Sequence, residues 1–93
     1  MNSKMLVPNI NESQKSLLEK HMANIALGDK EALADLYKLT KSAVYGFALS
    51  ILKNTHEAED VLQEVYIKVY ENALSYKSNE KPLSWILTIT KNL

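Results

Sequence analysis

The segment from residue 30 to residue 53 constrains the fold of this chain more than any other. One set of its residues, most of them apolar, recurs every three or four positions. On a helix this set falls within an arc of about 120°. A helix with so long an apolar stripe must pack against other elements, so the segment predicts a long helix that forms the backbone of a core. The stripe comprises Leu33, Leu36, Tyr37, Thr40, Val44, Phe47, Ala48 and Ile51.

The segment from residue 55 to residue 74 predicts a second amphipathic helix. We expect Thr55 to cap it, because a hydroxyl can accept a hydrogen bond from the first turn. Opposite the core side lie acidic residues, and Glu64 precedes Lys68 by four positions, the favourable order for an ion pair. The residues expected in the core are Ala58, Leu62, Val65, Tyr66, Val69 and Ala73.

A third strip of this helix, Gln63, Ile67, Tyr70 and Leu74, lies beside the acids and away from the core side. Two interpretations of Ile67 are open. Another helix of the same domain packs on it, or it is the apolar centre of a docking surface for a basic partner. The polar residues around such a centre are Asp60, Gln63, Glu64 and Glu71.

The remaining segments predict two more helices. Residues 1–10 are expected to be a flexible leader, and a helix that begins between residues 11 and 13 is expected to end before Gly28, with Asp29 as the cap of the next helix. A polar loop follows at 75–81. Pro82 then suits the first position of a last helix, where its missing N–H costs nothing.

The last helix, residues 82–93, has an apolar side and a polar side. Hydroxyls, an amide and an amine on one face can bind phosphates or base edges, or can simply face solvent. The sequence stops within the apolar pattern, so we expect this helix to continue in a longer parent. Leu83, Trp85, Ile86, Ile89 and Leu93 are expected to face the domain, Leu87 and Thr90 to lie at the margin, and Ser84, Thr88, Lys91 and Asn92 to lie on the polar side.

Composition limits the functional classes. The chain has 93 residues, of which 46% are apolar, with only two glycines and two prolines, so one small all-α domain is expected. The absence of cysteine excludes thiolate chemistry and fits a cytoplasmic location. His21 and His56 lack metal-ligand spacing, so we expect no metal and no cofactor. No apolar run approaches the roughly 20 residues of a membrane span, so no membrane insertion is expected.

Charge and motifs indicate binding and not catalysis. The formal net charge is zero, so attraction to nucleic acid cannot be argued from net charge. Charge is nevertheless uneven: residues 57–71 hold five acids and one lysine, whereas residues 76–93 hold three lysines and one acid. Two poles of opposite sign suggest two different partners. No phosphate loop or nucleophile elbow occurs, so we expect no enzyme activity.

Three segments together resemble region two of bacterial RNA polymerase sigma factors of the extracytoplasmic-function group. They are GDKEALADLY at 28–37, HEAEDVLQEVYIKVY at 56–70 and PLSWILTITKNL at 82–93, and the resemblance covers roughly residues 23–93. It implies that residues 11–93 form a compact bundle of three main helices plus a shorter N-terminal helix. It also implies a role in transcription initiation.

The resemblance implies two partners. Core RNA polymerase would contact Asp60, Gln63 and Glu64 through the clamp coiled coil of its largest subunit. We add Ile67 to these contacts because it is the apolar centre of the third strip. The promoter minus-ten element would bind as non-template single strand near the polar loop and the last helix. Tyr76 is the only aromatic residue of the loop, and stacking on an aromatic is worth about 1–3 kcal/mol per base. The candidate DNA-binding residues are Tyr76, Lys77, Ser78, Asn79, Ser84, Thr88, Lys91 and Asn92.

Within those candidates, the resemblance implies a phosphate contact for Lys91 and a base or backbone contact for Asn92. The family's tryptophan matches Trp85, which we expect in the core and not as a wedge in the DNA. The family normally continues this helix with basic residues and adds a helix-turn-helix domain that reads the minus-thirty-five element. Neither occurs in this sequence, so we expect weak promoter binding by this chain alone. An anti-sigma protein is a further implied partner. The alternative interpretation is a helical protein-interaction adaptor that never touches DNA.

Overall fold

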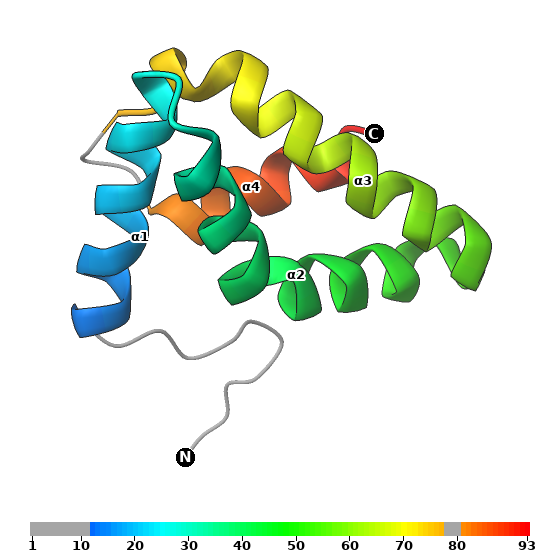
Figure 1. Cartoon of the computed structure of the whole chain (residues 1–93). Helices are drawn as coiled ribbons and strands as arrows, with labels where there is room; N and C mark the ends of the chain where they lie inside the picture. The colour runs from blue at the N-terminus through cyan, green and yellow to red at the C-terminus, as the bar shows by residue number, and fades with distance from the viewer. Residues whose placement is uncertain (1–11, 78–80) are drawn as a thin grey trace.

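The computed structural model describes residues 12–77 and 81–93. Within these ranges it contains four α-helices and one short 3-10 helix and no strand, which confirms the all-α fold (Figure 1). The shortest α-helix is the last one, with 10 residues, and not the first, which has 15. The elements are α1 (Glu12–Ala26), α2 (Lys30–Leu52), α3 (Thr55–Asn72), η1 (Ala73–Ser75) and α4 (Pro82–Lys91).

The corner between α1 and α2 is built as expected. Gly28 has a φ of 92°, a conformation that glycine adopts without steric cost, and its N–H donates to the carbonyl of Ile25 at 2.8 Å. The Asp29 carboxylate accepts hydrogen bonds from the N–H groups of Glu31 and Ala32, at 2.9 and 3.2 Å. Both the stop and the cap are confirmed.

Replacing Asp29 by Ala is expected to lower the free energy of unfolding by about 1 kcal/mol, because two N–H groups of the first turn of α2 lose their acceptor. Urea unfolding measures the change. The control is Asp35→Ala, which removes an exposed carboxylate from the same helix without touching a cap. An Asp29→Ala variant as stable as the control would contradict the cap's contribution.

The corner between α2 and α3 differs from expectation. Asn54 is the N-cap of α3, and its side-chain oxygen accepts a hydrogen bond from the N–H of Glu57 at 3.0 Å. The prediction that Thr55 caps this helix is therefore wrong by one residue. The reason lies in Lys53, whose left-handed φ of 55° ends α2 and leaves Asn54 extended, the conformation that an N-cap requires.

The core forms where α2 contacts α1, α3 and α4. Most of the predicted core positions are buried, but Ile51 is 53% exposed because it lies on the last turn of α2, far from α1 (Figure 1). Thr90, expected at the margin, is buried and donates to the carbonyl of Ile86, whereas Leu93, expected to face the domain, is 50% exposed beyond the end of α4. The central cluster is Leu18, Met22, Ile25, Ala32, Leu36, Val44, Val65, Tyr66, Val69, Ala73 and Ile86.

One polar link crosses this core. The Thr40 hydroxyl donates to the carbonyl of Leu36 at 2.7 Å, so its only hydrogen is used, and the Tyr66 hydroxyl must donate to Thr40 across 2.6 Å. The ring of Tyr37 packs edge-on against Tyr66, with centroids 5.0 Å apart. Burial raises the pKa of Tyr66 to about 12, because the buried hydroxyl is more stable in its neutral form. The link therefore joins α3 to α2 at a defined register.

Candidate functional site

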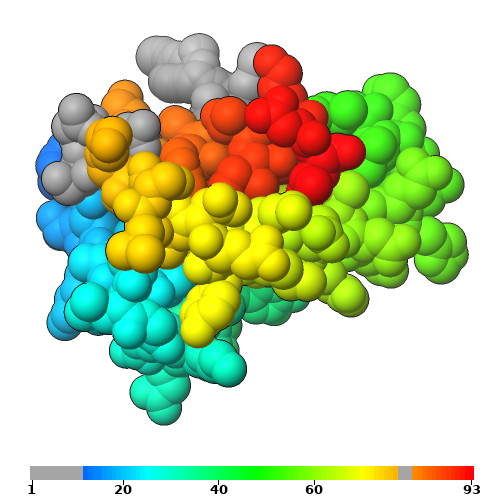
Figure 2. All heavy atoms as spheres, turned by 90° about the horizontal axis from the view of Figure 1, so that it is seen from above, coloured from blue at the N-terminus to red at the C-terminus, as the bar shows by residue number. Residues whose placement is uncertain are grey.

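The outer face of α3 carries the residues expected to bind a protein partner. Asp60, Gln63, Glu64 and Ile67 are all exposed, and we call them the α3 outer surface. Ile67 is 51% exposed, so none of the described helices covers it as the first interpretation required. In Figure 2 the atoms of α3, lime to yellow, lie on the face toward the viewer. The apolar strip continues through half-buried Tyr70 to Leu74, which is 84% exposed.

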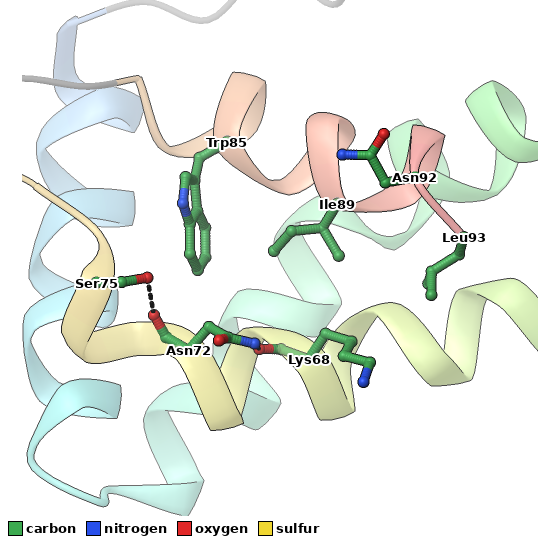
Figure 3. A pocket seen from close by; sticks show the side chains of 7 residues that line it. All are labelled: Lys68, Asn72, Ser75, Trp85, Ile89, Asn92 and Leu93. Carbon is green, nitrogen blue, oxygen red and sulfur yellow. Dashed lines mark hydrogen bonds between the residues drawn. The ribbon is translucent and has the colours of Figure 1, made fainter.

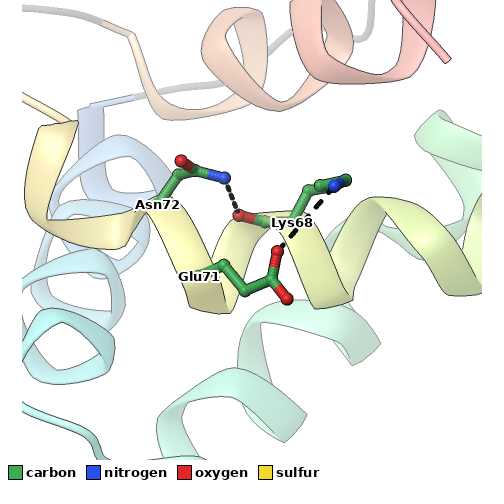
Figure 4. Close-up of polar contacts among 3 residues, drawn as sticks. All are labelled: Lys68, Glu71 and Asn72. Carbon is green, nitrogen blue, oxygen red and sulfur yellow. Dashed lines mark hydrogen bonds and ion pairs between the residues drawn. The ribbon is translucent and has the colours of Figure 1, made fainter.

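The ion pair between Glu64 and Lys68 that the sequence predicts does not form, so it does not neutralise this surface. Lys68 lies 3.9 Å from the carboxylate of Glu71, three residues later, and not against Glu64 (Figure 4). Both partners are about half exposed, and such ion pairs contribute little to stability. Within residues 12–77 and 81–93, Glu64 has no ion pair, so its charge is available to a partner.

A second feature is a pocket of about 350 Å³ between the C-terminal part of α3 and α4 (Figure 3). Half-buried Trp85 projects into it from α4, so the expectation of a core tryptophan is only half right. Ser75 and Asn72 are held by hydrogen bonds to backbone carbonyls, from the Ser75 hydroxyl to Asn72 at 2.7 Å and from the Asn72 amide to Lys68 at 2.8 Å. The lining residues are Lys68, Asn72, Ser75, Trp85, Ile89, Asn92 and Leu93.

Sequence reasoning named only Asn92 of this lining as a site residue. Lys68 and Asn72 of α3 and Ser75 of η1 were missed because their spacing is that of any solvated helix side. The pocket exists only because the end of α3 lies beside α4. A clue was present in the row Trp85, Ile89 and Asn92, whose spacing of four and three places them on one side of a helix.

Tyr76 is engaged by two other parts of the domain. Its hydroxyl donates to the Glu19 carboxylate of α1 at 2.7 Å, and its ring packs edge-on against Trp85, with centroids 5.4 Å apart. The ring is half-buried, whereas the neighbouring Lys77 is exposed. Ser78 and Asn79, also expected near DNA, lie outside the described residues.

The polar side of α4 forms a row beside the pocket. Ser84, Thr88 and Lys91 are exposed and each precedes a pocket residue by one position, which places them about 100° around the helix. The Thr88 hydroxyl donates to the carbonyl of Ser84 at 2.9 Å. Asn92 is exposed at the C-cap of α4 and lines the pocket. The expected DNA-binding residues of α4 thus occupy two adjoining rows.

Comparison with known families identifies the domain. Residues 36–93, which begin within α2 and extend past the end of α4, match the model of sigma-70 region 2. The chain belongs to this sigma factor family. The earlier resemblance is therefore confirmed.

Relatives place the sigma domain in the extracytoplasmic-function group. It is 35% identical over 77 residues to the ECF RNA polymerase sigma factor SigW of Bacillus subtilis, covering 83% of this chain and 41% of that protein. It is 36% identical over 73 residues to the sigma factor SigK of Mycobacterium tuberculosis, covering 77% and 39%. The chain thus spans about two fifths of the length of these relatives.

Two other kinds of feature do not occur in residues 12–77 and 81–93. No cluster of three or more metal-ligating side chains occurs there. None of the described helices has both the length and the apolar composition of a membrane span.

Proposed function

We propose that this domain acts in transcription initiation by docking on core RNA polymerase through the α3 outer surface and by holding the promoter minus-ten element as non-template single strand. It acts in the cytoplasm and catalyses no step itself. The observation that carries the proposal is the exposure of Ile67 among Asp60, Gln63 and Glu64 on a helix of the sigma-70 region 2 family.

The docking half of the proposal rests on the character of this surface. An apolar side chain surrounded by polar groups is the usual form of an interaction hot spot. Two exposed acids, Asp60 and Glu64, favour a partner with basic residues, and Glu64 has no internal ion pair in the described ranges. A helical face of this kind packs well against another helix, which fits the clamp coiled coil of the largest polymerase subunit.

The DNA half of the proposal rests on the pocket between α3 and α4. Its volume of about 350 Å³ lies within the range of small-ligand sites. Trp85 offers an aromatic face for an unstacked base, and the Asn92 amide can both donate to and accept from a base edge. In this proposal Lys91, with the exposed Ser84 and Thr88 in the adjoining row, binds the phosphates. Tyr76, Lys77, Ser78 and Asn79 remain proposed contacts of the same strand.

The second candidate is a helical adaptor that binds protein only, and the balanced net charge favours it. Salt dependence separates the two. A minus-ten oligonucleotide titrated onto the protein is expected to bind more weakly as salt rises, because phosphate contacts release counterions. Trp85 is the only tryptophan, so its fluorescence reports the binding.

Replacing Lys91 by Ala is expected to reduce the slope of log affinity against log salt by about 0.7, the share of one phosphate contact in single-stranded DNA. The control is Lys38→Ala, which removes an exposed lysine from α2. Equal slopes for the two variants would contradict the role of Lys91. If neither this domain nor a longer chain that continues past Leu93 binds the oligonucleotide, the adaptor is the better interpretation.

A further inference from the structure

We infer that Glu19 of α1 is a positioning residue for the pocket between α3 and α4, because it holds Tyr76 against Trp85, the aromatic wall of that pocket. The inference rests on the proposed single-strand binding and adds a residue from outside the matched family region, which begins at residue 36. No sequence pattern pointed to Glu19. It stands out only because the fold brings it to Tyr76, 57 residues later in the chain.

The first link is the bond between Glu19 and Tyr76. At 2.7 Å between Oε2 and the hydroxyl oxygen, in a partly buried setting, it is a hydrogen bond to a charged acceptor, which is roughly twice as strong as a neutral one. It ties the segment after η1 to α1. The helix α1 also contacts η1 and α4 directly, so the acceptor sits on a packed element.

The second link is the ring contact between Tyr76 and Trp85. Their planes meet at 68° with centroids 5.4 Å apart, the edge-to-face arrangement that aromatic pairs prefer. Trp85 is only half-buried, so its side chain depends on such neighbours for a fixed orientation. Loss of the Glu19 bond therefore removes one restraint on the Tyr76 ring, and the face that Trp85 offers to a base becomes less well defined.

A purely electrostatic role for Glu19 predicts the opposite sign. If its carboxylate only repelled the phosphates of bound DNA, removal of the charge would strengthen binding, and Ala and Gln would act alike. If Glu19 positions Tyr76, Ala weakens binding. Gln, which keeps an oxygen that can accept from the Tyr76 hydroxyl, largely restores it. The two neutral variants therefore separate the roles.

The experiment measures the affinity of a minus-ten single-stranded oligonucleotide for five variants. Glu19→Ala and Tyr76→Phe are each expected to weaken binding about fivefold, and the double variant no further, because both remove the same bond. Glu19→Gln is expected to bind within about twofold of the unmodified protein. Glu12→Ala, which removes an exposed acid at the start of α1, is the matched control and is expected to leave binding unchanged.

A second readout needs no DNA. Quenching of Trp85 fluorescence by acrylamide is expected to increase in Glu19→Ala and Tyr76→Phe and to stay unchanged in Glu12→Ala. Equal quenching and equal affinity in Glu19→Ala and Glu12→Ala would overturn the inference, as would tighter binding by both neutral Glu19 variants. Failure of the proposed function is distinguishable, because the unmodified protein itself would then bind no oligonucleotide, and the inference would fall with it.

Discussion

A variant carrying Asp60→Ala and Glu64→Lys is expected to bind core RNA polymerase about a hundredfold or more weakly, while its melting temperature stays within a few degrees of the original. Both side chains are exposed on α3, and in the described ranges neither takes part in an ion pair. Their replacement therefore removes little from the folded domain. At a docked interface, the new lysine would meet a basic partner with like charge and without a counter-ion.

The measurement is co-purification or surface binding of the variant to the core enzyme, beside thermal unfolding of the domain alone. The matched control carries Asp35→Ala and Glu12→Lys, two exposed acids on α2 and α1, and changes the net charge by the same amount. It is expected to bind normally. Loss of binding by the control, or loss of folding by the Asp60 and Glu64 variant, would defeat the assignment of the α3 outer surface.

The second large effect concerns pH. Burial raises the pKa of Tyr66 from 10.0 to about 12, so the unfolded chain loses this proton at lower pH than the folded domain does. The contribution of the protonated Tyr66 hydroxyl to the free energy of unfolding is therefore fully present below about pH 10. It is lost as pH rises from about 10 to about 12. A shift of this size corresponds to about 2–3 kcal/mol of stability lost across that window.

Urea unfolding at intervals between pH 9 and about 11.5 measures this loss. The comparison is Tyr66→Phe, which keeps the ring but has no proton to lose. Its cost at neutral pH is expected to be about 1 kcal/mol, because Thr40 still donates to Leu36. The difference between the two stability curves isolates Tyr66 from the other titrating groups. Parallel curves would show that folding does not raise the pKa of the Tyr66 hydroxyl.

Local features of the fold were predictable because they depend on residues close in sequence. The stripe of α2, the stop at Gly28, the cap at Asp29 and the proline that starts α4 each involve neighbours within about one helical turn. The prediction that Thr55 caps α3 was wrong, and the cause is also local. Its neighbour Asn54 is an equally good cap, and the backbone of Lys53 selects between them.

The exposed acids of α3 follow from periodicity, but the exposure of Ile67 does not, because it depends on whether another helix lies alongside. The pocket also depends on how the helices pack, since its wall comes from α4 and its floor from α3 and η1. The bond between Glu19 and Tyr76 joins residues with no shared pattern. Helical period and caps are properties of short segments, whereas contacts between segments are set by how the helices pack, and only the folded chain brings those side chains together.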